Sequence, residues 1–511
     1  MTSPEPGVER RAIRERERAR GRRVPRLPIL LIVVGAIVAA AVLGTGGADS
    51  GGDVADRPDA DAGATAVPAA EIVEGRTSAT WYCAAGSSDP EGFADETVVV
   101  ANIGDEDADV LVTVERGDEG DPVRERYVVP AGSQERILVS DLVESVSPGV
   151  VVEAFGGTVV VDHLLRGADD VAGGPCATTA SPTWYFAAGT TTADTGQFLE
   201  LFNPFGDDAV VDVTLFTAAG TVPDQSLEGF VVPAHSKVRA EIHTALPREE
   251  ILGLSVEARS GRLVAERTTV YIGNIKTPGL AVSLGAMAPA TDWAIVEGRV
   301  GPDVSEAVVV LNPGDTTAEI EASFAVDGDT PVEPQVLSVP PRSVAALGLG
   351  EQLPVDEGHT VRIRSVNDRP VVVDQRWVFR GPSTALGVAG TDGITAGSGR
   401  WAFGYAAVTE GSADRIVIFN PAVFSEGETV RVSATVFADG TREELRAADL
   451  DAADLDVTDV PLEPGRRLTV KLGDVPDIEQ AALEITATGP VMATLVSFPS
   501  GVAVTSGVPV R

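Results

Sequence analysis

The sequence predicts an all-β protein in which four tandem immunoglobulin-like β-sandwich modules follow one N-terminal transmembrane helix. Three observations predict this arrangement. An uncharged apolar run near the start is long enough to cross a bilayer as a helix. A pattern that opens on tryptophan then recurs four times at nearly equal intervals. Within each copy, short runs rich in Val, Ile, Thr and Phe alternate with turns of Gly, Asp, Asn and Pro.

Length and composition bound the class of protein. A chain of 511 residues is too long for a single core and suggests several domains. Its 44% hydrophobic residues, 54 Gly and 34 Pro are typical of a globular chain rich in turns. The formal net charge is −37, although the N-terminal stretch is rich in Arg. Because so acidic a surface repels phosphate backbones, we expect no nucleic-acid partner.

The N-terminal part divides into an Arg-rich tail (residues 1–26), the apolar run (residues 27–46) and a stretch of Gly, Ala, Asp and Pro (residues 47–78). Arginines lie directly before the run and none lies directly after it, so the positive-inside rule places the tail in the cytoplasm. We therefore expect a single-pass plasma-membrane protein whose bulk is extracytoplasmic and is carried on a flexible linker. Cleavage of the run as a signal peptide stays open as the alternative.

The four copies of the repeat occupy residues 79–180, 181–290, 291–398 and 399–511. Each copy opens on a tryptophan, which we expect to anchor the core of its module: Trp81, Trp184, Trp293 and Trp401. An asparagine follows at a near-constant distance and predicts a turn, because its side chain can bond the backbone that follows it: Asn102, Asn203, Asn312 and Asn420. The closing strands of the first three copies carry a carboxylate, for which we expect a structural hydrogen bond: Asp162, Glu266 and Asp374. The fourth copy has Thr494 at this place.

The first copy holds about seven candidate strands in roughly 100 residues, which is the pattern of an immunoglobulin-like sandwich. Each copy ends on a short apolar segment, such as the one that begins at Gly279. We expect this segment to lie beside the opening tryptophan strand of its own copy, so that each module starts and ends in one place. The sequence leaves open whether the modules form a rod or interlock in a closed ring.

Few side chains suggest chemistry. Cys83 and Cys176 are the only cysteines, and an even pair within one exported module predicts a disulfide bond. The four histidines are scattered, and we expect His163 to lie on a strand surface. We predict no catalytic residue, no metal site and no cofactor. The acidic insert at residues 449–459 is predicted to be a solvated loop, with Ca²⁺ binding as the alternative.

The second copy shows the repeat motifs most completely, with a Trp-Tyr-Phe opening at Trp184, an Asn203-Pro204 turn, a Val-Pro-Ala-x-Ser turn at residues 232–236 and Ala-Glu-Arg at residues 265–267. These motifs resemble an uncharacterised actinobacterial family of membrane-anchored or secreted β-repeat proteins. The resemblance covers about residues 79–511. It implies an extracytoplasmic location and a repeat architecture, and it implies no activity.

These observations favour a non-enzymatic, membrane-anchored cell-envelope protein with a structural or protein-interaction role. Its partner is expected to be an envelope protein or a wall polymer. The alternative is a cell-wall polymer or carbohydrate-binding protein, which would need exposed aromatic side chains, and aromatic residues make up only 5% of the chain. A hydrolase is disfavoured because the sequence has no Gly-x-Ser-x-Gly elbow, no phosphate-binding glycine loop and no His-Glu-x-x-His motif.

Overall fold

The computed structural model describes residues 67–511 apart from residues 118–119, 169, 194, 272–278, 329, 351–352, 356, 380–386, 408–413, 423–426, 448–454, 473–479 and 498–502. The predicted tail, the apolar run and residues 47–66 of the predicted linker lie outside this part of the chain. Residues 61–511 form one compact unit. Its secondary structure is almost entirely antiparallel β-sheet, as the sequence predicts. No helix within the described ranges is long and apolar enough to cross a membrane.

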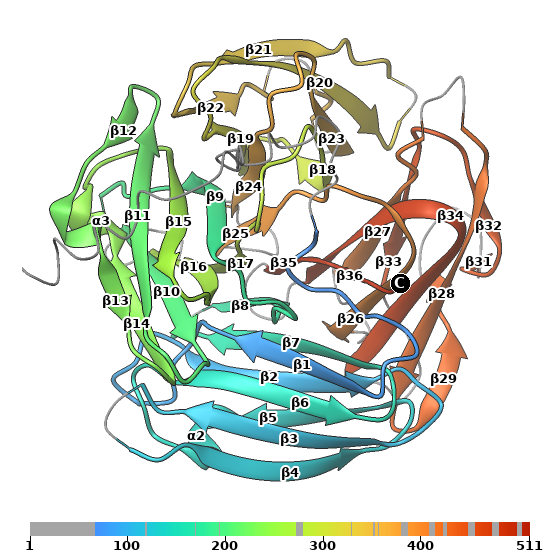
Figure 1. Ribbon diagram of the computed structural model, residues 1–511. Helices are drawn as coiled ribbons and strands as arrows, with labels where there is room; N and C mark the ends of the chain where they lie inside the picture. The colour runs from blue at the N-terminus through green and yellow to red at the C-terminus, as the bar shows by residue number, and fades with distance from the viewer. Residues whose placement is uncertain are drawn as a thin grey trace, which may run out of the picture. The chain divides into compact units, whose positions relative to one another are not determined.

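The first copy folds into two antiparallel sheets of four strands that share a core, an arrangement that resembles a β-sandwich (Figure 1). One sheet has the order β1 (Ser78–Cys83), β6 (Gly149–Phe155), β3 (Ala108–Glu115), β4 (Val123–Val129). The other has the order β5 (Ser133–Leu138), β2 (Asp95–Asn102), β7 (Val159–Arg166), β8 (Val171–Pro175). A single helical turn, α2 (Val139–Leu142), follows β5. The copy therefore has eight strands, one more than the sequence predicts, and the additional strand is β8.

The second and third copies repeat this plan. The sheets of the second copy are formed by β9 (Thr183–Gly189), β15 (Leu252–Ser260), β11 (Ala209–Thr217), β12 (Gly220–Val222) and β13 (Phe230–Val232), and by β14 (Ser236–Glu241), β10 (Thr195–Asn203), β16 (Val264–Tyr271) and β17 (Gly279–Leu284). A short helical turn, η1 (Gln225–Leu227), lies between β12 and β13, and another, α3 (Ile242–Ala245), connects β14 of one sheet to β15 of the other. The sheets of the third copy are formed by β18 (Asp292–Arg299), β23 (Gly358–Ser365), β20 (Ala318–Val326) and β21 (Gln335–Val339), and by β22 (Ser343–Leu347), β19 (Val304–Asn312), β24 (Val372–Phe379) and β25 (Gly387–Asp392).

The fourth copy departs from the plan because two strands fuse into one. In the other copies a residue with positive φ turns the chain between the two closing strands: Gly156, Gly261 and Asp368. Gly489 lies at that place in the fourth copy without a positive φ, and β34 (Gln480–Ser497) continues through it and pairs in both sheets. The other strands are β26 (Ser398–Ala407), β27 (Arg415–Phe419), β28 (Val430–Ala438), β29 (Thr441–Glu444), β30 (Arg446–Ala447), β31 (Leu455–Asp456), β32 (Val460–Leu462), β33 (Arg467–Lys471), β35 (Ala503–Ser506) and β36 (Val508–Pro509).

The end of each copy lies beside the opening strand of the same copy, but the contact is made by residues just after the predicted apolar segment. The segment that begins at Gly279 itself pairs with β16, so for this segment the prediction is wrong. Backbone bridges join Tyr82 to Ala177, Tyr185 to Ala286, Ala294 to Ile394 and Trp401 to Pro509. Each copy therefore starts and ends in one place, and every described sheet is built from the strands of one copy.

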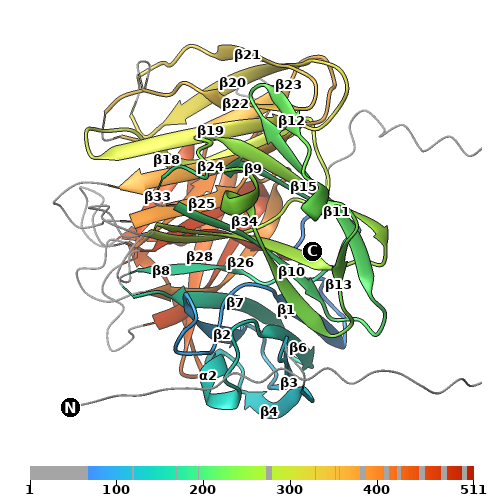
Figure 2. The ribbon, with the colours of Figure 1, turned by 90° about the vertical axis from the view of Figure 1, so that its left-hand side faces the viewer.

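The four copies nevertheless meet in cyclic order. Strand β8 of the first copy contacts β17 of the second, β17 contacts β25 of the third, β25 contacts β35 of the fourth, and β35 contacts β8. Figure 1 shows these four strands around a common centre, and Figures 1 and 2 both place the first and third copies on opposite sides of it. The contacts describe a closed cycle of copies and not a rod, although no single sheet closes on itself.

The chain segment that precedes the first copy completes this cycle. Ile72 runs parallel to Val510, with hydrogen bonds from Ile72 N to Pro509 O at 2.9 Å and from Arg511 N to Ile72 O at 2.8 Å. The largest core cluster accordingly combines side chains of the first, second and fourth copies. The copies share buried surface with their neighbours, and residues 67–511 pack as one body.

Candidate functional site

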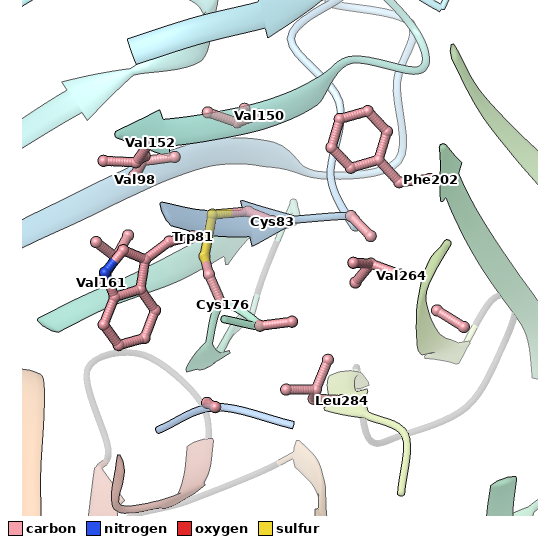
Figure 3. Close-up of a cluster of buried hydrophobic side chains, with 14 of the residues drawn as sticks. Trp81, Cys83, Val98, Val150, Val152, Val161, Cys176, Phe202, Val264 and Leu284 are labelled. Atoms are coloured by element: carbon pink, nitrogen blue, oxygen red, sulfur yellow. A yellow bond between two sulfur atoms is a disulfide. The ribbon is translucent and has the colours of Figure 1, made fainter. Parts of the chain in front are cut away.

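The four repeated tryptophans are buried, as predicted, with exposed fractions of 0% for Trp81 and Trp184 and 2% for Trp293 and Trp401. The indole nitrogen of each of the last three donates to a backbone carbonyl of the same copy, for example from Trp184 Nε1 to Leu263 O at 2.9 Å. Trp81 lies in the core of the first copy next to the disulfide (Figure 3). These side chains are therefore core anchors and offer no exposed stacking surface.

The predicted disulfide bond between Cys83 and Cys176 is confirmed, with 4.7 Å between the two Cα atoms. It ties β1 to the closing segment of the first copy (Figure 3). His163 lies close enough to both sulfur atoms to suggest a metal site on distance alone. Because both sulfurs are bonded to each other, neither can act as a thiolate ligand.

The repeated asparagines make the predicted turn and also make a second contact that the sequence does not reveal. Asn102 Oδ1 accepts from Gly104 N at 3.0 Å, and its amide nitrogen donates to Val129 O at 3.0 Å, across the sandwich. The same pair of contacts recurs at the other three positions: Asn203, Asn312 and Asn420. Each asparagine thus fastens its turn to the end of the strand that precedes the proline turn.

The recurring carboxylates do make structural hydrogen bonds, but their partners belong to a neighbouring copy. Glu266 of the second copy accepts from Ala84 N at 3.1 Å and from Ala85 N at 2.8 Å in the first copy. Asp374 of the third copy accepts from Ala187 N at 2.6 Å and Ala188 N at 3.3 Å in the second copy.

The first copy closes the cycle in the same way. Asp162 accepts from Gly404 N at 2.9 Å and Tyr405 N at 3.2 Å in the fourth copy. The three carboxylates therefore bind the opening strand of the preceding copy just beyond its tryptophan. At the remaining junction Thr494 replaces the carboxylate, and a buried charge cluster takes its place: Glu297 of the third copy pairs with Arg415 and Arg467 of the fourth.

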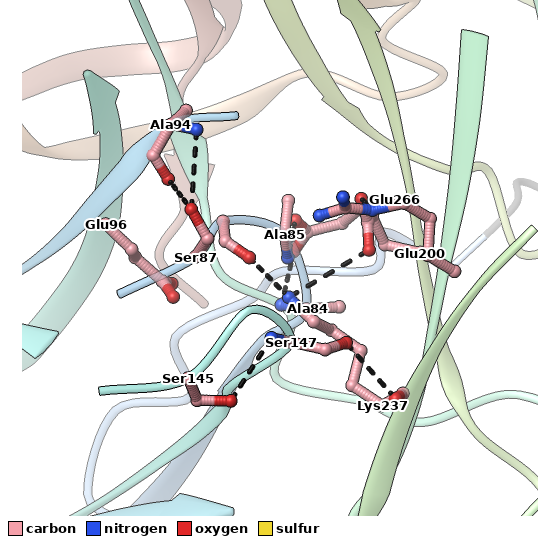
Figure 4. A network of polar contacts seen from close by, with 12 residues as sticks. Ala84, Ala85, Ser87, Ala94, Glu96, Ser145, Ser147, Glu200, Lys237 and Glu266 are labelled. Atoms are coloured by element: carbon pink, nitrogen blue, oxygen red, sulfur yellow. Dashed lines mark hydrogen bonds and ion pairs between the residues drawn. The ribbon is translucent and has the colours of Figure 1, made fainter. Parts of the chain in front are cut away.

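The junction of the first and second copies buries a network of titratable groups (Figure 4). His163 lies between Glu96, with its Nδ1 3.2 Å from Oε1, and Glu266, with its Nε2 3.4 Å from Oε2. Lys237 Nζ donates to Gly86 O at 2.7 Å and lies 3.9 Å from Glu200 Oε2. His163 is only 1% exposed, so the expectation of a strand-surface position is wrong. Its carboxylate neighbours come from distant parts of the chain, which no local pattern reveals.

Burial dominates the electrostatics of this junction. Desolvation raises the pKa of Glu96 and Glu266 and lowers the pKa of Lys237. Burial alone would lower the pKa of His163, but the carboxylates of Glu266 and Glu96 outweigh it and the pKa is raised. The network thus matches buried acids with buried bases, which is how charged groups are retained inside a protein.

A second repeated polar position also escaped the sequence analysis. It lies six residues before each repeated asparagine and is occupied by Glu96, Gln197, Glu306 and Asp414. Three of these residues are buried, and the side chain of the fourth, Glu306, is 0% exposed. In the second copy Gln197 Oε1 accepts from Thr190 N at 3.1 Å, and in the third Glu306 Oε2 accepts from Arg299 N at 2.9 Å. The constant spacing from the asparagine could have revealed this position in the sequence. The position was missed because the residue type differs between the copies.

An axial pocket with a cavity volume of about 120 Å³, partly open to solvent, lies where the closing strands of the four copies meet. Its walls come from residues 173–175, 282–288, 390–396, 504, 506, 507, 509 and 511, from the preceding segment 67–70, and from the edges of Trp293 and Trp401. Most of the wall is apolar, with Leu284, Ile394 and Val504 among its side chains. Ser283, Thr391 and Asp392 supply polar groups. This pocket has the features of a small-molecule site, since it is concave, mostly apolar and carries a few polar groups.

The acidic insert at residues 449–459 lies in part outside the described residues. In its described part, the carboxylate of Asp459 is paired with the guanidinium of Arg431. Comparison with protein families finds one model that matches residues 154–461, and its description is "Family of unknown function (DUF5719)". None of the curated proteins matches the sequence.

Proposed function

The chain belongs to this family of unknown function, and we propose that it is a non-enzymatic, membrane-anchored actinobacterial cell-envelope protein with a structural or protein-interaction role. The observation that carries the proposal is the use of the recurring carboxylates. Asp162, Glu266 and Asp374 each bind two backbone N–H groups of a neighbouring copy. Side chains that a hydrolase would direct at a substrate are here engaged in joining one copy to the next.

The cyclic contact of the copies supports a rigid scaffold. Four immunoglobulin-like modules in a row would bend at their linkers, whereas copies that share core side chains and carboxylate bonds move together. Val336, on the edge strand β21, is 85% exposed and is therefore a suitable place to probe for an envelope-protein partner.

The membrane anchor is proposed from residues 27–46 and the arginines that precede them. Residues 47–66 would then connect the bilayer to Val67, which lies at the axial pocket. The compact unit would be attached to the membrane at the place where residues 67–74 meet residues 508–511.

The test is carried out on the full chain in its own cells. A photo-crosslinking amino acid at Val336, which is 85% exposed, should capture a recurrent envelope protein, and the same substitution at buried Val361 should capture none. External protease should digest residues 67–511 in intact spheroplasts while the N-terminal tail stays protected. A protein that is released from the membrane with a mature start near residues 45–50 would show a cleaved signal peptide instead.

The second candidate function is binding of a wall polymer or carbohydrate. Its usual aromatic platform is not supplied by the four repeated tryptophans, because all four are buried in their own copies. Co-sedimentation of the chain with purified wall material separates the two proposals. Saturable binding that survives removal of wall proteins favours the polymer, and binding that disappears with those proteins favours a protein partner.

A further inference from the structure

The axial pocket combines walls from all four copies with two polar atoms that lack partners. Ser283 Oγ and Asp392 Oδ1 are both buried and have no hydrogen-bond partner among the described residues. Ser283 as a whole is only 7% exposed, and both residues line the pocket. Buried polar atoms in folded proteins are almost always bonded, so these two oxygens are able to accept a hydrogen bond from a ligand in the pocket.

The carboxylates around Asp392 outnumber the cations that pair with them by one. Asp392 lies directly opposite Asp374 on the neighbouring strand. The only cation paired with these two carboxylates in the described part of the chain is Arg267, whose guanidinium lies 3.2 Å from Asp374 Oδ2. Glu266, the other acid that acts on Asp392, adds a further negative charge and has His163 as its own partner. One of the two aspartates therefore needs a proton or a second cation.

Burial and the charge of Asp374 raise the pKa of Asp392 well above its ordinary value. A proton therefore satisfies Asp392 while the pocket is empty, and a cation that enters the pocket would displace that proton. The one other charged group of the wall, Arg511, already has a partner, since its guanidinium lies 3.6 Å from Glu71 Oε2. The wall thus has an acceptor for a cation and no free cation for an anion.

We propose that the axial pocket binds a small amphiphile that carries a single primary amine head. The apolar tail would lie against Leu284, Ile394 and Val504, and the ammonium would donate to Asp392 and to Ser283 Oγ. Binding transfers one proton from the Asp392 carboxyl to the solvent, and the ammonium replaces it as the positive partner. This ligand site goes beyond the scaffold role and does not depend on membrane anchoring.

The experiment uses the full chain in lipid nanodiscs, with empty nanodiscs as the blank, and titrates three isosteric probes by calorimetry: hexylamine, hexanol and hexanoate. Hexylamine should bind at least about tenfold more tightly than the other two probes, because only it supplies the missing positive charge. Its binding heat should vary with the ionisation enthalpy of the buffer, which reports the released proton. Its affinity should fall when the pH is lowered from 8 to 5, since protons then compete for Asp392.

Asp392→Asn should bring the affinities of the three probes within about twofold of one another. Asp105→Asn, at an exposed carboxylate, is the matched control and should keep the preference for hexylamine. A melting temperature no lower than that of the unmodified chain shows that the Asp392→Asn variant is folded. Should it unfold, the pH series on the unmodified chain decides alone. Equal or tighter binding of hexanoate, an affinity for hexylamine that does not change with pH, or no saturable binding would overturn the proposal.

Discussion

The carboxylate of Asp162 in the first copy accepts a hydrogen bond of 2.9 Å from the backbone N–H of Gly404 in the fourth copy. The two residues are among the most widely separated in sequence of all the bonded pairs, and their contact joins the ends of the repeat. Since Glu266 and Asp374 repeat the contact between consecutive copies, one rule of assembly serves three of the four junctions. The rule requires a carboxylate on the closing strand and two free N–H groups beyond the tryptophan.

Replacement of Asp162 by Ala should lower the free energy of unfolding by about 2–5 kcal/mol, because two buried N–H groups lose their acceptor. Urea denaturation measures this loss. Asp162→Asn, which keeps an acceptor oxygen, should cost distinctly less. Thr494→Ala removes the side chain at the equivalent place in the fourth copy and is the matched control. An equal loss for Asp162→Ala and Thr494→Ala would contradict the role assigned to the carboxylate.

Replacement of Trp184 by Ala should destabilise the protein by about 3–5 kcal/mol, as for other buried large aromatic side chains. Trp184→Phe should cost less, because the ring volume is largely kept and only the bond to Leu263 O is lost. Both values come from the same urea titrations. Losses below about 1 kcal/mol for the alanine variant would show that the repeated tryptophans do not anchor their cores.

Removal of the disulfide should cost about 4–5 kcal/mol on a chain-entropy estimate, since the bond spans 93 residues. The double variant Cys83→Ala/Cys176→Ala tests this, and the reduced unmodified chain is its control. The two should melt at similar temperatures, both below the oxidised protein. Free thiols in the unmodified chain, purified without reductant, would contradict the bond itself.

The stability should be higher at pH 5 than at pH 8. Burial raises the pKa of Asp162 and of Asp170 to about 7, against an ordinary value of 3.8. A carboxyl with a raised folded-state pKa stabilises the fold fully below its ordinary pKa, and this contribution is lost as the pH rises towards 7. Glu297 acts in the opposite sense, because Arg467 and Arg415 overcome its burial and lower its pKa, but its contribution is lost only below its ordinary pKa.

Melting temperatures between pH 5 and pH 8 test this expectation. The acidic surface alone would also favour lower pH, so the double variant Asp162→Asn/Asp170→Asn is needed to separate the two causes. The variant should have a smaller slope, because the surface charge and the other buried acids with raised pKa values, Glu96, Glu266 and Asp392, still contribute. An unchanged slope would show that Asp162 and Asp170 do not cause the pH dependence.

The sequence predicts the features that depend on short-range pattern. Alternating apolar residues and turn residues predict the strands, the tryptophan spacing predicts equivalent core positions, and Asn102 and its equivalents carry their own turn chemistry. The strand β8 escaped because Gly173 and Gly174 give it little β-propensity, and it forms only by pairing with β7.

The partners of the polar residues could not be predicted because they depend on how the copies meet. Glu266 bonds Ala84 and Ala85 across 181–182 residues of chain, and His163 is buried only when the second copy brings Glu266 against it. From the sequence of a single copy, such side chains are predicted to lie on the surface. Their burial follows from the cyclic contact, for which the sequence contains no periodic signal.

The pairing of Ile72 with Val510 has a consequence for biosynthesis. A chain that leaves the ribosome from its N-terminus exposes Ile72 long before Val510 exists. The first copy can fold and form its disulfide early, but its junction with the fourth must wait for residues 508–511. Until residues 508–511 are synthesised, the backbone N–H and C=O of Ile72 have no strand partner. Of the four junctions, the one between the first and fourth copies is therefore the last that can be completed.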